Sequence, residues 1–129
     1  MGETECNRYT ARDRLLTRQC DILLPDVCRA GGICETLRIA QLADTFGLLW
    51  APHVSISTPL HLGAATPNFL VCEYPTSFDD SPIGKALCTD SPVPKDGAIE
   101  VTDAPGLGVS LDEAQVEQLT ALSEIRTTH

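Results

Sequence analysis

Four ionisable residues follow short apolar stretches of the chain, each about one strand–helix unit from the next. Asp26 ends "DILLPD", His53 ends "LLWAPH" and Glu73 ends "FLVCE", and Glu3 holds the matching place near the N-terminus. A carboxylate on one nitrogen of an imidazole fixes the tautomer and makes the other nitrogen more basic. We therefore interpret Asp26 and His53, on neighbouring strands, as a pair able to act as general base or acid.

The two remaining carboxylates suit other roles at the same site. Glu3 offers the oxygen ligand that a hard cation such as Mg²⁺ prefers. Glu73 faces the same centre from the other side and could donate a hydrogen bond if it stays protonated. A single acidic residue after a strand is usually a helix cap or a turn residue, and a single histidine after proline is more often structural. Four such residues in register are harder to explain in this way, and the pattern alone leaves a catalytic site and structural roles as equal alternatives.

The elements that must position these residues alternate between strand and helix. "CDILLP", "LLWAP" and "FLVCEY" are continuous apolar runs, typical of strands buried on both faces. Strands separated by helices predict parallel pairing with right-handed crossovers, and chemistry at the carboxyl ends of the strands. The sequence therefore predicts an α/β fold in which Asp26 stands on the floor of a site.

The helices are predicted from apolar spacing and from their end signals. Residues 9–19 form the first, with Leu15 and Leu16 packing inward, and "TPLHLGAAT" forms the third. Gly47 follows the second as a left-handed C-cap. The inward face of the second helix is predicted to consist of Ile33, Leu37, Ala40, Ala43 and Phe46.

The amino-acid composition of the chain changes after Tyr74. Residues 75–97 are rich in Pro, Asp and Ser and are predicted to be loop, and "GAIEVTDAPGLGVSL" is expected to form a small irregular hairpin around Pro105-Gly106. A last helix follows in "DEAQVEQLTALSEI", with Asp112 as its N-cap and Gln115 completing a capping-box pattern.

Composition excludes several classes of function. The chain has 129 residues, 43% of them hydrophobic, which is enough for one small globular domain. A net charge of −9 argues against nucleic-acid binding. No apolar run could span a membrane, and no signal peptide is evident. The six cysteines form no Cys-x-x-Cys pair, so we interpret them as small buried residues of a cytoplasmic protein rather than as zinc ligands or disulfides.

These same segments resemble the C-terminal part of the enolase superfamily, in its mandelate racemase/muconate-lactonising branch. The matching segments are "GETE", "DILLPDVCRAGGICETLRIAQLAD", "LLWAPHVSISTPLHLGAATPN", "FLVCEYP" and "DGAIEVTDAPGLGVSLDE". The resemblance implies that Glu3 is a metal-ligating carboxylate and that Asp26 and His53 form an Asp–His dyad. It implies that Glu73 helps to stabilise an enediolate, which forms on Mg²⁺ when the proton next to a substrate carboxylate is removed.

Within this branch, "PHVSISTPLHLGAATPN" and "EYP" look most like acid-sugar dehydratases, with an acid-sugar substrate. Racemases and cycloisomerases share the scaffold and remain alternatives, as does a non-catalytic remnant or a small metal-binding protein using His53, Glu3 and Glu73. Arg8 and Ser55 lie near the predicted strand ends and are candidates for substrate contact.

The chain departs from the family in length. A full (β/α)₈ barrel takes about 250 residues, so residues 1–129 are expected to be the C-terminal part of a barrel domain: the last three to four β/α units, a hairpin and a helix. The first half of the barrel and the N-terminal capping domain are missing from this pattern. The resemblance therefore implies that the chain alone is inactive and that a complementing half chain or a homo-oligomer completes it.

Overall fold

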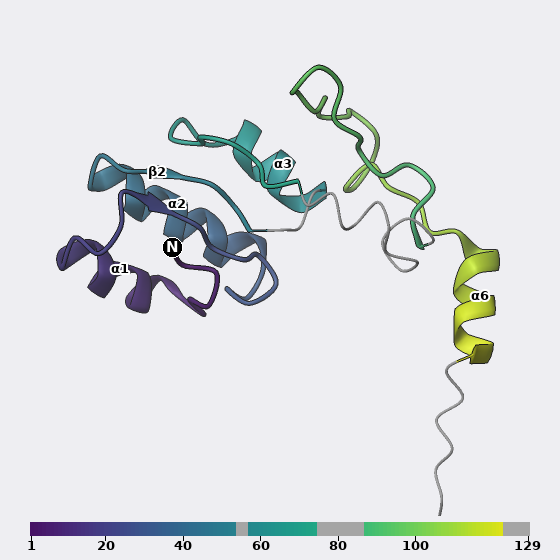
Figure 1. Cartoon of the computed structure of the whole chain (residues 1–129), viewed down its shortest axis with the longest axis horizontal. Coiled ribbons are helices and arrows are strands. Elements are labelled where there is room, and N and C mark those ends of the chain that lie inside the picture. Colours follow the sequence, from purple (N-terminus) through teal and green to yellow (C-terminus); the bar gives the residue numbers. More distant parts are fainter. Residues whose placement is uncertain (54–56, 75–86, 123–129) are drawn as a thin grey trace, which may run out of the picture. The chain divides into compact units, whose positions relative to one another are not determined.

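The computed structural model describes residues 1–53, 57–74 and 87–122, and the chain divides into two compact units. Met1–Tyr74 and Pro92–Thr102 form the first unit, and Pro75–Ser91 and Asp103–His129 the second. Within the described residues, no helix is long and apolar enough to cross a membrane. The elements are α1 (Arg8–Leu16), β1 (Ile22–Leu23), α2 (Ile33–Thr45), β2 (Leu49–Trp50), α3 (Ser57–Ala64) and α6 (Glu113–Leu122) (Figure 1).

The first unit is built on parallel strand pairing, as the alternation of apolar runs and helical patterns predicts. β1 and β2 are parallel neighbours, with Leu23 opposite Trp50. The pairing continues beyond the two short strands, because the His53 N–H donates to the Pro25 carbonyl over 3.0 Å. The carboxyl ends of both strands therefore lie at the same edge of the sheet.

Two further segments flank this pair. On the far side of β1, the Met1 ammonium donates to the Ile22 carbonyl, and the Met1 carbonyl accepts from the Leu24 N–H over 2.8 Å. On the far side of β2, Trp50 forms a parallel bridge with Phe69. The order across the sheet is thus the N-terminal segment, β1, β2 and the segment around Phe69, all pointing the same way. This is the partial α/β barrel arrangement that the sequence predicts.

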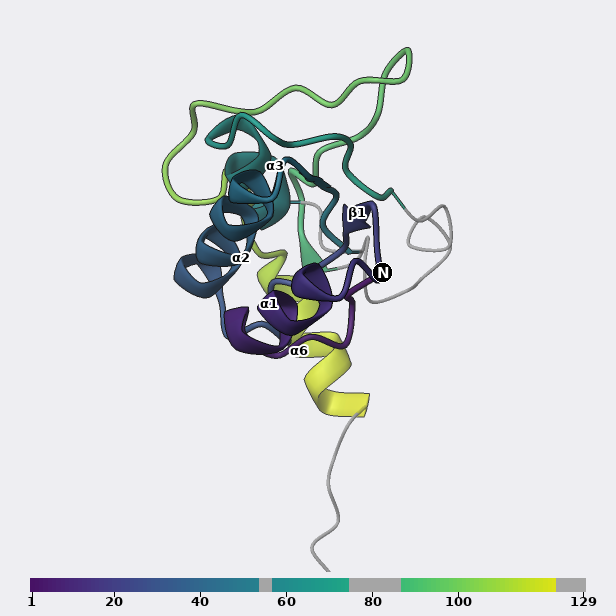
Figure 2. The same ribbon diagram turned by 90° about the vertical axis from the view of Figure 1, so that its left-hand side faces the viewer.

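The three helices of this unit lie on one side of the strands, in the order α3, α2, α1 (Figure 2). Their buried faces meet around Trp50, which is fully buried and contacts Phe69 edge to face with ring centroids 5.8 Å apart. The indole N–H donates to the Thr66 hydroxyl over 2.9 Å. Gly63 of α3 lies against the Phe69 ring. A Cβ at this position would come within 2.7 Å of that ring, so only glycine allows α3 to approach it this closely.

The expected inward faces of the first two helices are only partly right. Leu15 is buried, but Leu16 is 62% exposed, because adjacent positions on a helix point in different directions. In α2, Ala40 and Ala43 are buried as predicted, whereas Ile33 and Phe46 lie at the helix ends and are exposed. The residues that α2 buries are Thr36, Ile39, Ala40 and Ala43. Gly47 has a φ of +69°, which confirms the left-handed C-cap.

The second unit corrects the predicted hairpin. Cys88 and Leu111 form an antiparallel bridge, so the partner of the "VSL" stretch lies well upstream of Pro105-Gly106 and not within residues 97–111. The tight antiparallel turn is elsewhere, in the first unit, between Lys95 and Ala98. Asp112 caps α6 as expected, accepting from the Gln115 N–H over 3.1 Å.

Candidate active site

The four residues singled out from the sequence lie at the same end of the parallel segments in the first unit. Glu3 follows the N-terminal segment, Asp26 follows β1, His53 follows β2 and Glu73 follows the segment around Phe69. The placement arises from the parallel register, which brings every carboxyl end to one edge. Residues far apart in the sequence thereby share one small surface.

His53 is the centre of this group. Its Nδ1 lies 2.7 Å from Oε2 of Glu73, and its Nε2 lies 3.3 Å from Oε2 of Glu3. The imidazole is 23% exposed, while Glu3 and Glu73 are about half exposed. A neutral imidazole has one N–H, so with that proton on Nδ1 and donated to Glu73, Nε2 carries a lone pair. The arrangement can therefore accept a proton at Nε2 and stabilise the resulting charge through carboxylates on both sides.

Asp26 is placed differently from the expectation that its carboxylate would face the His53 ring. Its Oδ1 accepts from the backbone N–H groups of Cys28 (2.7 Å) and Arg29 (3.3 Å), and its Oδ2 lies 3.7 Å from Arg29 Nε. Among the described residues, no hydrogen bond joins Asp26 to His53. The physical reason is local: the turn after β1 offers N–H donors two and three residues ahead, the geometry that aspartate side chains favour.

The two candidates for substrate contact have different outcomes. Arg8 begins α1, and its backbone N–H and guanidinium both donate to the carboxylate of Glu35 in α2, over 2.9 and 2.6 Å. Its other terminal nitrogen donates to the Tyr9 hydroxyl. The structure therefore gives Arg8 a role in joining α1 to α2. Ser55 lies outside the described residues.

The contact between Glu35 and Arg8 predicts a pH effect on stability. The hydrogen bond from the Arg8 backbone N–H, aided by Arg38 and by the Arg8 charge, lowers the pKa of Glu35 below its usual 4.5. A carboxyl group with a lowered pKa in the folded state stabilises the fold above its unfolded pKa, and this stabilisation is lost as pH falls through the folded value. We expect Glu35→Gln to lower the unfolding midpoint near neutral pH, and the gap to the parent chain to close below about pH 4.5.

Urea titrations at several pH values measure this effect. Glu117→Gln, at an exposed position of α6, is the matched control and should leave the midpoint nearly unchanged. A gap for Glu35→Gln that stays constant down to pH 3 would show that the ionised contact is not its cause.

The described residues do not form a complete metal site. Among residues 1–53, 57–74 and 87–122, no group of three or more His, Cys, Asp or Glu side chains is arranged to hold a metal ion. Glu3 is the carboxylate expected to bind Mg²⁺, and its oxygen lies against His53. Mg²⁺ requires near-octahedral oxygen coordination, which one carboxylate cannot define. The described residues thus supply one ligand of such a site and not the complete set.

Sequence reasoning missed a buried ion pair close to the site. Glu5 is only 5% exposed, and its carboxylate is paired with the guanidinium of Arg14 in α1. A buried glutamate is uncommon unless it is paired. The available signal was that Glu5 stands two residues after Glu3, with the arginine-rich first helix following at once.

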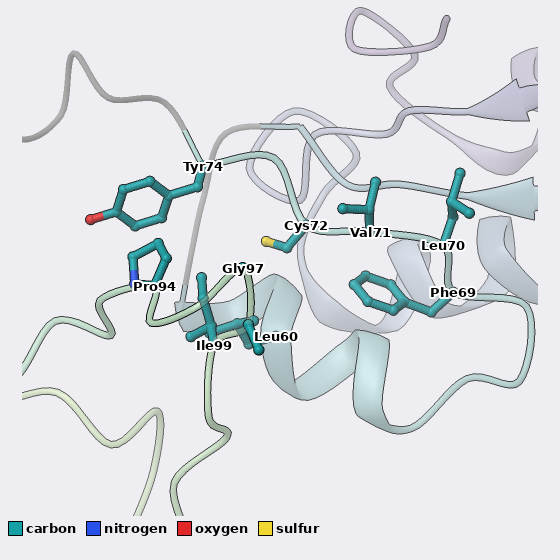
Figure 3. A pocket seen from close by; sticks show the side chains of 10 residues that line it. Leu60, Phe69, Leu70, Val71, Cys72, Tyr74, Pro94, Gly97 and Ile99 are labelled. Carbon is teal, nitrogen blue, oxygen red and sulfur yellow. The ribbon is translucent and has the colours of Figure 1, made fainter.

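An apolar pocket of about 420 Å³ lies in the same unit, between the segment after Asn68 and the turn near Gly97 (Figure 3). Burial, and to a lesser extent the charge of Glu73, raises the pKa of the Cys72 thiol, so this side chain is a neutral wall residue and not a nucleophile. The lining residues are Leu60, Phe69, Leu70, Val71, Cys72, Tyr74, Pro94, Gly97, Ala98 and Ile99.

The six cysteines are free thiols in this structure. The expectation that they are buried is wrong: Cys6, Cys28 and Cys34 are exposed, and the others are partly buried. Apolar neighbours in the sequence do not by themselves bury a side chain: Cys34 lies in the first turn of α2 and is exposed.

Comparisons with known proteins identify the family to which the chain is similar. The family described as "Enolase C-terminal domain-like" matches residues 1–115. An L-rhamnonate dehydratase of Saccharopolyspora erythraea is 35% identical over 115 residues, which cover 86% of this chain and 30% of that protein.

Solved structures of the same family have a similar fold. A mandelate racemase/muconate lactonizing enzyme from Jannaschia sp. CCS1 superposes with a TM-score of 0.79 at 34% identity, covering 91% of this chain and 30% of the other. L-Talarate dehydratase from Polaromonas sp. JS666, solved with Mg and L-glucarate, gives a TM-score of 0.78 at 32% identity, with coverage of 91% and 31%. The chain thus spans about a third of the length of these relatives. The extent of the family match and the shared fold together show that this chain belongs to the enolase C-terminal domain-like family.

Proposed function

We propose that this chain is the C-terminal part of the barrel of a Mg²⁺-dependent acid-sugar dehydratase, in which His53 removes the proton next to the substrate carboxylate. The observation that carries the proposal is His53 at the rim of a parallel sheet, with a carboxylate against each ring nitrogen at 2.7 and 3.3 Å. The relatives named as L-rhamnonate and L-talarate dehydratases support the substrate class, a polyhydroxy carboxylate.

In the proposed reaction, the lone pair of His53 Nε2 takes the α-proton of the acid sugar. Glu3 must move off Nε2 for the substrate to enter, which its half-exposed side chain permits. The carboxylate on Nδ1 stabilises the imidazolium that forms. The electron pair released at the α-carbon then expels the β-hydroxyl, which takes up a proton and leaves as water. The enol that remains becomes a 2-keto-3-deoxy acid.

The Asp–His dyad is part of this proposal. Asp26 and His53 stand on neighbouring strand ends, since the His53 N–H binds the Pro25 carbonyl. In the structure Nδ1 is bound by Glu73, so the proposal requires Asp26 to replace Glu73 on Nδ1 in the assembled site. Glu73 then stabilises the charged intermediate. Asp26→Asn should lower turnover more than Glu73→Gln if this exchange takes place.

Magnesium enters the proposal only through Glu3. Solved relatives carry Mg, but this chain supplies only one carboxylate suited to hold the ion. The remaining ligands are proposed to come from a complementing half chain or a second copy. Ser55, which follows His53 closely, remains a proposed substrate contact. Free thiols suit the reducing cytoplasm, which we propose as the location.

A chimera tests the proposed function. The segment of the S. erythraea rhamnonate dehydratase that matches this chain is replaced by residues 1–129, so that the relative supplies the rest of the barrel. We expect the chimera with Mg²⁺ to form 2-keto-3-deoxy products from one or more of L-rhamnonate, L-talarate and galactarate, detected by semicarbazide. The isolated chain should form none, because it holds one metal ligand.

Two other results would identify the alternatives. Exchange of the α-proton without loss of water would indicate a racemase or cycloisomerase. A folded chimera that neither exchanges the proton nor forms product would contradict catalysis and favour a non-catalytic remnant. Turnover by the isolated chain would contradict the ligand argument.

A further inference from the structure

Glu5 is the most deeply buried carboxylate near the site, and the proposed reaction does not use it. Its side chain is 6% exposed and is paired with Arg14, whose side chain is 34% exposed. Leaving a carboxylate without a partner at such a position is strongly unfavourable, so the pair acts as a fixed anchor. Arg14 also donates to the Gln19 side chain over 3.2 Å and to the sulfur of Met1. It therefore links the anchor to the N-terminal residue and to the segment after α1.

The anchor closes the turn that carries Glu3. The Glu5 N–H donates to the Gly2 carbonyl over 2.9 Å, which makes residues 2–5 a tight turn with Glu3 at its tip. Gly2 has a φ of +128°, and a Cβ there would lie 3.2 Å from the Leu24 nitrogen, so the turn is pressed against the strand end. One end of the turn is thus held by the sheet and the other by the pair with α1.

Glu3 itself has little else to hold it. Its side chain is 52% exposed, and among the described residues its one side-chain contact of this kind is the ion-pair contact with His53 Nε2, at 3.3 Å. The direction of the Glu3 carboxylate therefore depends on the backbone of the turn. We propose that Glu5, through Arg14, is the positioning residue that fixes this turn and so directs Glu3 to His53. The use of Glu3 at this position rests on the proposed function, but its contact with His53 can be measured without substrate or metal.

Nitrogen NMR of the whole chain tests this inference. The chain has three histidines, so ¹⁵N-histidine labelling gives a simple spectrum at one fixed pH. Glu3→Gln defines how far the His53 Nε2 signal moves when its partner changes. We expect Glu5→Gln to move that signal by at least half as much, with a smaller movement at Nδ1, which faces Glu73. In the Glu3→Gln background, Glu5→Gln should have no further effect on Nε2.

Glu35→Gln is the control for a merely structural role, because it also breaks an ion pair of α1 but lies outside the turn. An equal movement of Nε2 in Glu35→Gln, or no movement in Glu5→Gln, would overturn the inference. If Glu5→Gln fails to fold, Glu5→Asp and Arg14→Lys replace it. We expect either variant to move the Nε2 signal by an intermediate amount. An unmoved signal would overturn the inference. Absence of dehydratase activity in the chimera, together with the expected NMR result, would refute the proposed reaction and leave this inference standing.

Discussion

His53→Asn in the chimera is expected to lower the rate of α-proton removal by about 10²–10⁴-fold, the usual cost of losing a general base. Asparagine keeps a polar group of similar size near Glu73, but it has no nitrogen that can accept and carry a proton at neutral pH. Because the contacts of His53 are made at the solvent edge of the sheet, the substitution should leave the core intact. Exchange of the substrate α-proton with solvent deuterium, followed by NMR, measures the step directly.

His61→Asn provides the matched control. His61 lies in α3, and the proposed reaction does not use it. Its replacement should leave exchange within about twofold of the parent chimera. Nearly normal exchange in His53→Asn would remove His53 from its proposed role, whatever the effect on overall turnover.

The parallel arrangement and the common edge of the four ionisable residues could be predicted from the sequence. Both depend on simple periodicities: continuous apolar runs for buried strands, and helical spacing between them. A residue that directly follows such a run is fixed at the strand end by the backbone alone. This is why the positions of Asp26, His53 and Glu73 along the edge agree with the structure without any knowledge of side-chain contacts.

The partners of those side chains could not be predicted in the same way. Whether Asp26 faces the His53 ring or the turn after β1 depends on competition between two sets of donors, and the nearby N–H groups of Cys28 and Arg29 bind it in the structure. The pairing of Arg8 with Glu35 joins residues far apart in sequence, and neither lies in an apolar pattern that would predict the contact. Sequence periodicity determines which face a residue is on, but not which of several polar groups it will bind.

The outer edge of the segment around Phe69 is expected to make the chain self-associate. The Trp50 N–H binds the Asn68 carbonyl and the Leu70 N–H binds the Trp50 carbonyl, so every second residue of this segment faces β2. The backbone N–H and C=O groups of Phe69 and Val71 point away from β2. Within residues 1–53, 57–74 and 87–122, no backbone hydrogen bond is made to these groups. Leu70 and Val71 are also 44% and 55% exposed. An apolar strand edge with free backbone groups pairs readily with another chain.

Val71→Lys should weaken this association. A lysine on an edge strand must lose much of its hydration if a second strand docks there, and two copies bring two like charges together. We expect the dissociation constant to rise by about tenfold or more, equivalent to about 1.4 kcal/mol. Val93→Lys makes the same replacement in the same unit at a side chain that is 70% exposed and lies outside the paired segments, so it should leave association unchanged. Sedimentation velocity over a range of concentrations compares the three proteins. A parent chain that stays monomeric and unfolds in one sharp transition would show that this edge is satisfied within the chain, and the argument from the free backbone groups of Phe69 and Val71 would be wrong.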